Sequence, residues 1–252
     1  MYKNRRYRIV DMIARKGLCL LTLTFVLTGC AGKDSANVNA EVSDRQSDFS
    51  KIRKKNSDAF AWINIPGTVI DYPVLQSEDG DDSFYKSHNE LKKDDEKGAI
   101  YIEAANLKDM CDFNEVVHGS SPLDGSMFAG LDNFLNKEYF DQHKFIYVYT
   151  EDNSLIYYIA AAFARDDTRL LEQYDFSYAS GCSEFIEEIY DKSNENKLIR
   201  EDCESVLEPE HFLITLSSNS KAVPGKQIVV VGCLVGDAAG KIDRYVDYGN
   251  EE

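Results

Sequence analysis

The chain has 252 residues, of which 43% are hydrophobic and 12% aromatic. That is enough apolar material for one well-packed domain of about 200 residues. The formal net charge of −16 argues against a nucleic-acid-binding protein, because phosphate backbones are bound by clusters of lysine and arginine.

The N-terminal segment, residues 1–29, has the pattern of a lipoprotein signal peptide. Basic residues are concentrated between Lys3 and Lys16, and an apolar run follows over residues 17–27. The run is shorter than the roughly 18–20 residues that a membrane-spanning helix needs. Leu27-Thr28-Gly29-Cys30 is similar to a bacterial lipobox, which predicts cleavage before Cys30 and lipidation of that cysteine. An ordinary signal peptide or a short signal anchor with an incidental cysteine is the alternative.

Residues 30–50 are small and polar, which predicts a flexible tether between the membrane and a folded domain. An acidic surface is repelled by anionic lipid headgroups, so membrane attachment is expected to depend on the lipid anchor. The segment 49–60 has an amphipathic helical pattern, with Ile52, Ala59 and Phe60 spaced for one face.

From residue 61 onward the hydrophobic pattern changes to that of β-strands. Apolar, β-branched or aromatic segments predict eight strands at 61–65, 69–75, 98–102, 115–118, 145–149, 154–163, 211–217 and 228–235. Helical spacing appears at 124–135 and 183–194. We therefore predict a mainly β domain over residues 51–240: a closed eight-stranded barrel with an N-terminal helical segment and one long helix before the last two strands. An acidic tail follows at 241–252.

The cysteines beyond the leader show no metal-ligand spacing. Cys111, Cys182, Cys203 and Cys233 form neither a CxxC pair nor a Cys/His pattern, so we expect no zinc site, and nothing in the sequence calls for another cofactor. Export would permit a disulfide, for example between Cys182 and Cys203, but the sequence does not fix the connectivity. Buried thiols are the default expectation.

Several motifs in one order are shared with a known family. They are Ala61-Trp62-Ile63-Asn64-Ile65-Pro66-Gly67-Thr68, Ile70-Asp71-Tyr72-Pro73-Val74-Leu75-Gln76, Phe84-Tyr85 with His88, Asp124-Gly125-Ser126-Met127-Phe128, Thr215-Leu216-Ser217-Ser218 and Val229-Val230-Val231-Gly232. Over about residues 51–236 the chain resembles the class B sortases, cell-wall cysteine transpeptidases of Gram-positive bacteria. The resemblance implies a sortase-type barrel at the extracellular face of the cytoplasmic membrane.

The same resemblance points to three substituted positions. Sortase chemistry needs a cysteine nucleophile, a histidine acid/base and an arginine that steadies the oxyanion or the substrate. Where the family has these residues, this chain has Asn219, Ser120 and Gln227. An amide is not a competent nucleophile, and a serine hydroxyl does not exchange protons near neutral pH as imidazole does. The sequence therefore indicates a pseudoenzyme.

Two rearranged nucleophiles are alternatives. Ser217 shares a strand face with Asn219, and His118 shares one with Ser120, so a Ser217–His118 dyad is geometrically conceivable. Cys233 would be a relocated thiol, although it falls where strand core is expected. A non-catalytic member would instead hold an extended peptide of a sorting-signal protein, a pilin or an active sortase. A structural or signalling role without peptide binding is the remaining alternative.

Overall fold

The computed structural model describes residues 48–240. The predictions for the signal peptide, Cys30, most of the tether and the acidic tail from residue 241 lie outside these residues. Within them, no helix is both long and apolar enough to cross a bilayer.

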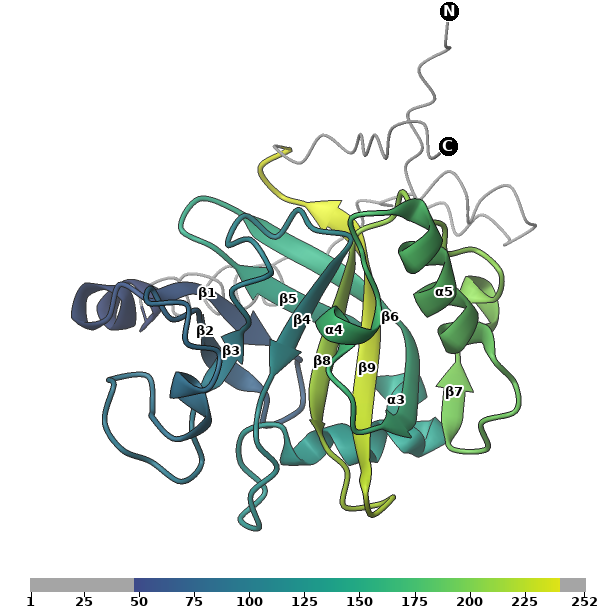
Figure 1. Cartoon of the computed structure of the whole chain (residues 1–252), viewed down its shortest axis with the longest axis horizontal. Helices are drawn as coiled ribbons and strands as arrows, with labels where there is room; N and C mark the ends of the chain where they lie inside the picture. Colours follow the sequence, from purple (N-terminus) through teal and green to yellow (C-terminus); the bar gives the residue numbers. More distant parts are fainter. Residues whose placement is uncertain (1–47, 241–252) are drawn as a thin grey trace, which may run out of the picture.

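The described part of the chain is built on a closed barrel of eight strands (Figure 1), which confirms the predicted fold class. The neighbours run in the order β5-β1-β2-β3-β4-β8-β9-β6, and pairing of β5 with β6 closes the ring. The pairs β2–β3 and β4–β8 are parallel. The strands of the barrel are β1 (Ala59–Asn64), β2 (Asp71–Leu75), β3 (Ile100–Ile102), β4 (Asn114–His118), β5 (Phe145–Tyr149), β6 (Ser154–Asp166), β8 (Leu213–Asn219) and β9 (Lys226–Asp237).

A ninth strand, β7 (Lys197–Ile199), escaped the sequence analysis. It pairs only with Ala161–Phe163 of β6, outside the ring. With three residues, each of them half-buried, β7 has no alternation of apolar and polar side chains that would mark it as a strand.

Short helices cover the outside of the barrel. Residues 48–55 are helical, which confirms only the first part of the helical segment predicted at 49–60, because Ala59 and Phe60 already belong to β1. The long helix before the last two barrel strands is α5, which begins at Ala179 and ends at Tyr190, so the predicted 183–194 was placed four residues late at both ends. The remaining helical elements are η1 (Phe84–Lys86), η2 (Ala129–Leu135), α3 (Lys137–Gln142), α4 (Leu170–Gln173) and η3 (Glu201–Cys203).

The predicted helix at 124–135 is wrong in its first half. Asp124 accepts hydrogen bonds from the backbone and the hydroxyl of Ser126, which closes a turn. Gly125 and Met127 both have positive φ, 81° and 54°, and a right-handed helix does not continue through such residues. Only Ala129–Leu135 is helical, as the 3₁₀ helix η2.

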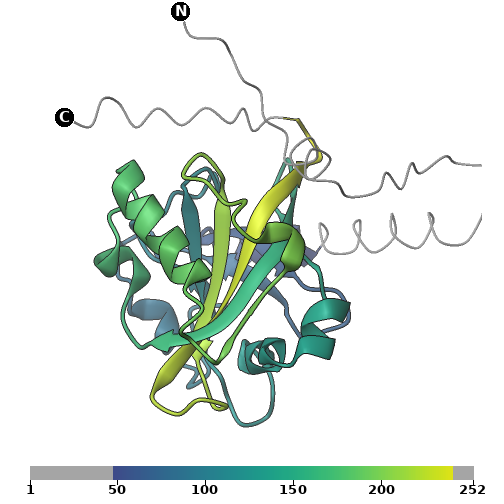
Figure 2. The ribbon, with the colours of Figure 1, turned by 90° about the vertical axis from the view of Figure 1, so that its right-hand side faces the viewer.

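Two apolar cores lie on opposite faces of the long strands. One fills the barrel and includes Ile228 and Val230 of β9. The other packs Val229, Val231 and Cys233 of the same strand beneath α5, which lies outside the barrel in Figures 1 and 2. Burial on both faces explains why residues 228–235 are apolar without interruption rather than alternating.

All four cysteines of the described segment are thiols: Cys182, Cys203 and Cys233 are buried, and Cys111 is exposed. The suggested disulfide between Cys182 and Cys203 is therefore absent from this structure. Burial raises the pKa of the Cys203 thiol. This thiol therefore stays protonated and unreactive, as expected inside a core.

Candidate functional site

A cavity of about 380 Å³ opens where β4 and β8 end and β9 begins. It brings together the three family positions that the sequence analysis singled out, Ser120, Asn219 and Gln227, together with His118 and Ser217. The other residues of its wall are Tyr85, Lys86, Lys97, Ala99, Tyr101, Gly119, Asp167 and Ser218. Segments that lie about 100 residues apart in the sequence meet here because β4 and β8 are direct neighbours.

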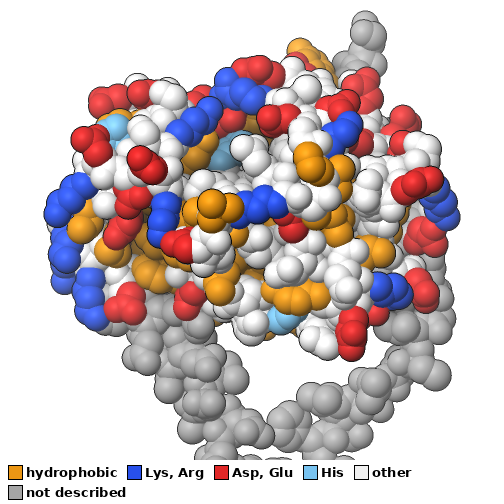
Figure 3. All heavy atoms as spheres, turned by 90° about the horizontal axis from the view of Figure 1, so that it is seen from below, with side chains coloured by type: hydrophobic (Ala, Val, Ile, Leu, Met, Phe, Trp, Pro, Cys, Tyr) orange, Lys and Arg blue, Asp and Glu red, His pale blue; other side chains and the backbone are white. Residues whose placement is uncertain are grey.

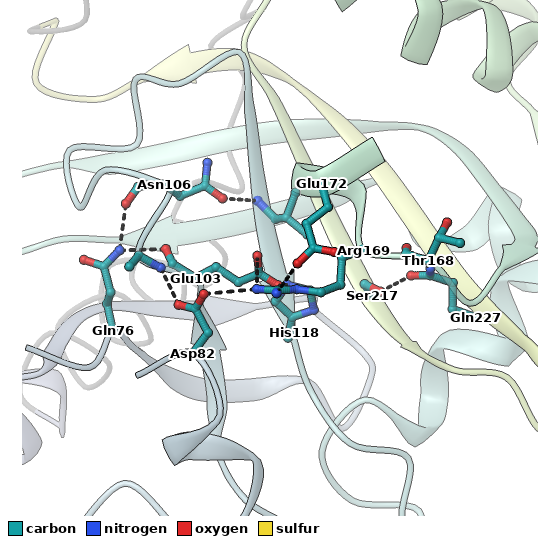
Figure 4. Close-up of polar contacts among 12 residues, drawn as sticks. Gln76, Asp82, Glu103, Asn106, His118, Thr168, Arg169, Glu172, Ser217 and Gln227 are labelled. Atoms are coloured by element: carbon teal, nitrogen blue, oxygen red, sulfur yellow. Dashed lines mark hydrogen bonds and ion pairs between the residues drawn. The ribbon is translucent and has the colours of Figure 1, made fainter. Parts of the chain in front are cut away.

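Gln227 and Ser217 form a hydrogen-bonded unit in the cavity wall (Figure 4). The Ser217 hydroxyl donates to Gln227 Oε1 at 2.6 Å. Gln227 Nε2 donates to the backbone oxygens of Asp166 at 2.8 Å and Thr168 at 2.6 Å. Both amide hydrogens of Gln227 are therefore donated to the backbone at the end of β6, which fixes the position of this side chain.

Ser120 and Asn219 complete the set of family positions. The Ser120 hydroxyl donates to the backbone oxygen of Lys97 at 2.6 Å, which ties the end of β4 to the loop before β3. Asn219 is exposed and lies directly opposite Gln227 in the β8–β9 pair. The two positions that the resemblance assigns to the nucleophile and the arginine of sortases are thus cross-strand neighbours.

The proposed alternative dyad is only partly assembled. His118 and Ser217 are paired residues of β4 and β8, so their strands place them side by side. The Ser217 hydroxyl, however, donates to Gln227 rather than to His118. Cys233 is paired with Leu213, toward the other end of β8, and packs in the core beneath α5 rather than in the cavity wall.

Glu103 and Arg169 are the site residues that sequence reasoning missed. His118 Nε2 lies 3.1 Å from Glu103 Oε1, and the imidazole stacks on Tyr101 with ring centroids 5.2 Å apart. Arg169 Nη2 lies 2.9 Å from Glu103 Oε2 and 3.0 Å from Asp82 Oδ2 (Figure 4). Glu103 follows a predicted strand directly, which was the available signal, but no local pattern connects it with an arginine 66 residues away.

The charge of Glu103 depends on these partners. Burial raises the pKa of its carboxyl, but contacts with His118 and Arg169 outweigh burial and hold the pKa at about 2, below the ordinary 4.5. The group is thus ionised throughout the physiological range. A carboxylate beside a histidine orients the imidazole, which is the usual task of such a residue next to a base.

This depressed pKa predicts a pH-dependent contribution to folding. Because the carboxyl binds protons more weakly in the folded state, its stabilisation is present above pH 4.5 and is lost as the pH falls toward 2. A shift of this size corresponds to about 3 kcal/mol. We expect Glu103→Gln to lower the free energy of unfolding by about that amount at pH 7, and to flatten its dependence on pH between 4.5 and 2. Urea unfolding at a series of pH values measures both effects.

The matched control is Glu172→Gln, which removes an exposed carboxylate that also contacts Arg169. We expect a change below about 1 kcal/mol from it. Identical acid-unfolding profiles for the Glu103→Gln variant and the unmodified chain would show that the Glu103 contacts do not lower its pKa.

The chemical inventory of the cavity is limited. Its wall has hydroxyls, amides, two lysines, one aspartate and one histidine, and the thiols of the described segment lie elsewhere. Among residues 48–240, no cluster of three or more histidine, cysteine, aspartate or glutamate side chains is arranged to hold a metal ion. The groups present suit the binding of a polar, extended ligand.

Comparison with known proteins identifies similar sequences. The chain is 39% identical over 113 residues to sortase B of Listeria monocytogenes, a match that covers 44% of each protein. It is 25% identical over 190 residues to sortase B of Staphylococcus aureus, with 74% of each protein covered. The first match thus spans less than half of that relative. No protein-family model matches the chain.

Solved structures share the fold. A mutant form of Clostridium perfringens sortase B superposes with a TM-score of 0.67 at 24% identity, covering 80% of this chain and 92% of that one. A Staphylococcus aureus sortase B–substrate complex gives 0.64 at 20% identity, covering 79% and 96%. A Streptococcus pyogenes class B sortase involved in pilus biogenesis gives 0.62 at 23%, covering 74% and 97%.

Proposed function

We propose that this chain is a peptide-binding member of the class B sortase family that does not perform the transpeptidase reaction, because it resembles sortase B proteins in sequence and shares their fold. The observation that carries the proposal is the meeting of Ser120, Asn219 and Gln227 in one cavity. The fold brings these positions together, but the side chains there are a hydroxyl and two amides.

The chemistry of these groups supports a loss of catalysis. A thioacyl intermediate requires a thiolate, and an amide cannot take its place. General acid–base catalysis requires a group that titrates near neutral pH, which a serine hydroxyl does not. Gln227 is neutral, and its amide hydrogens are already donated to the backbone oxygens of Asp166 and Thr168. Removal of a nucleophile alone typically lowers the rate on the order of a million-fold.

The proposed ligand is an extended peptide segment of a sorting-signal protein, a pilin or an active sortase. The cavity lies at the ends of β4 and β8, where a peptide would find both backbone groups and side-chain pockets. Among the proteins of the same fold, one was solved with its substrate, and another takes part in pilus biogenesis. We further propose that a lipid on Cys30 holds the domain, through the tether at 30–50, at the outer face of the cytoplasmic membrane of a Gram-positive bacterium.

Peptide binding is tested by filling the cavity. Asn219 is exposed at the cavity, so Asn219→Trp adds bulk there without disturbing the core. Labelled sorting-signal peptides are titrated with the purified chain, and we expect saturable binding that Asn219→Trp abolishes. Glu187→Trp, at an exposed position on α5, is the matched control and should bind normally. Peptide binding that survives Asn219→Trp would place the ligand elsewhere.

A hydrolase or transpeptidase with rearranged residues is the second candidate. The observation in its favour is the carboxylate of Glu103 beside His118. In this candidate Ser217 would be the nucleophile, His118 the base and Glu103 the acid that orients the histidine. This reaction would require the Ser217 hydroxyl to leave Gln227 and turn toward His118. Peptide cleavage that is lost in Ser217→Ala would establish this candidate, and cleavage lost in Cys233→Ala would assign the thiol instead.

A further inference from the structure

The cavity runs across the sheet, and the chemistry of its wall changes from one end to the other. The strands beneath it follow the order β3-β4-β8-β9-β6. Ala99 and Tyr101 lie at the β3 end, Ser217 and Gln227 are near the middle, and Asp167 directly follows β6. A ligand that fills the cavity therefore crosses from the β3 side to the β6 side.

The β3 end carries positive charge. Lys86 and Lys97 both line the cavity, and their segments are held together by the hydrogen bond from Ala99 N to Tyr85 O at 2.8 Å. Gly98 makes this approach feasible: its φ is +64°, and a Cβ there would lie 2.3 Å from Tyr85 O. Lys97 is paired with Asp124, whereas the exposed Lys86 ammonium has no ion-pair partner within residues 48–240.

The β6 end carries negative charge. Asp167 is exposed, lines the cavity and forms no ion pair within the described segment. Its backbone is fixed on both sides, because Gln227 Nε2 donates to the oxygens of Asp166 and Thr168, and Arg165 Nη1 donates to the latter at 2.9 Å. The Asp167 carboxylate is thus attached to a backbone whose position is fixed by hydrogen bonds on both sides.

We propose that this cavity selects an extended segment with an acidic side chain for Lys86 and a basic side chain for Asp167. Lys86 and Asp167 lie toward opposite ends of the cavity. An extended chain rises about 3.3 Å per residue, so the two charged side chains of the ligand would be several residues apart. This inference rests on the peptide-binding function proposed above and adds the charge pattern of the ligand.

The charge balance of the whole protein supports this selection. The chain carries a net charge of −16, so an unpaired lysine at the cavity is an exception that an acidic ligand group would complement. Acidic and basic side chains alternate over the lower face of the molecule, with hydrophobic side chains between them (Figure 3). Selection is thus expected from the two unpaired charges of the cavity rather than from a uniformly charged surface.

The test compares three labelled ten-residue peptides that differ only in two positions, one toward each end of the peptide. One has Glu before Lys, one has Lys before Glu, and one has Gln at both. We expect one of the charged orders to bind the full chain about tenfold more tightly than the neutral peptide, with a difference that decreases in high salt. The charge-swapped variant Lys86→Glu/Asp167→Lys should prefer the opposite order.

The control is Lys137→Glu/Asp141→Lys, which swaps an exposed ion pair on α3 and should leave the preference unchanged. If all three peptides bind equally well, the charge selection is overturned while peptide binding stands. If the swapped variant keeps the original preference, Lys86 and Asp167 are not its source. If no peptide binds, the proposed function fails together with this inference.

Discussion

Replacing Ser120 by histidine, Asn219 by cysteine and Gln227 by arginine in one variant is expected to produce sortase-type peptide cleavage. The three positions already lie in one cavity, and residues 219 and 227 are directly opposite each other on β8 and β9. A thiolate at 219 would attack the peptide carbonyl, the histidine would protonate the departing amine, and the arginine would stabilise the oxyanion. Since loss of such groups costs up to about a million-fold, we expect a gain of at least about a thousandfold over the unmodified chain.

This gain is measured by chromatography of the cleaved peptides and by the intact mass of the protein, which detects a thioester. The control is the variant with histidine at 120 and arginine at 227 but serine at 219, in which a hydroxyl replaces the thiol. It should fold and bind peptide but cleave far more slowly. A triple variant that binds peptide yet neither cleaves nor forms an adduct would show that the cavity no longer has sortase geometry.

Arg200→Met is expected to cause the largest loss of stability, about 4 kcal/mol. Arg200 is 7% exposed, and its guanidinium donates to the backbone oxygens of Ile159, Phe140 and His143 at 2.6, 2.5 and 2.9 Å. It also lies 4.3 Å above the Phe140 ring. Methionine fills much of the volume but leaves these carbonyls without their donor, and each unsatisfied buried carbonyl costs about 1–3 kcal/mol.

Urea unfolding monitored by circular dichroism measures this loss. The matched control is Lys192→Met, which removes the cation of an exposed ion pair with Glu204 and should change the free energy of unfolding by less than about 1 kcal/mol. If Arg200→Met and Lys192→Met have equal effects, Arg200 does not hold β6 and α3 together.

Strand positions could be predicted from the sequence because most barrel strands are long apolar segments between polar turns. Residues 228–235 illustrate this, since both faces of β9 are buried and the segment is apolar throughout. The start of the segment 124–135 was misjudged because apolar spacing does not report the positive φ of Gly125 and Met127. The three-residue strand β7 depends on pairing with β6, which no local pattern records.

The candidate site could be predicted only where it coincides with motifs. Ser120, Asn219 and Gln227 were found by their spacing from recognisable segments, and the parallel pairing of β4 with β8 brings them to one cavity. The contact of Glu103 with His118 and Arg169 could not be predicted, because it joins three segments of the chain across the fold. The bond from Ser217 to Gln227 is likewise a property of the β8–β9 register rather than of the sequence pattern.

The most direct test of the central claim, peptide binding without transpeptidation, is a single incubation of the full chain with a sorting-signal peptide and an amine acceptor. Binding is measured by anisotropy, and the same sample is then analysed by mass spectrometry for cleaved peptide, peptide joined to the amine and protein adduct. We predict saturable binding, peptide recovered intact and a protein of unchanged mass. Cleaved or transferred peptide that disappears in Ser217→Ala or Cys233→Ala would contradict the claim.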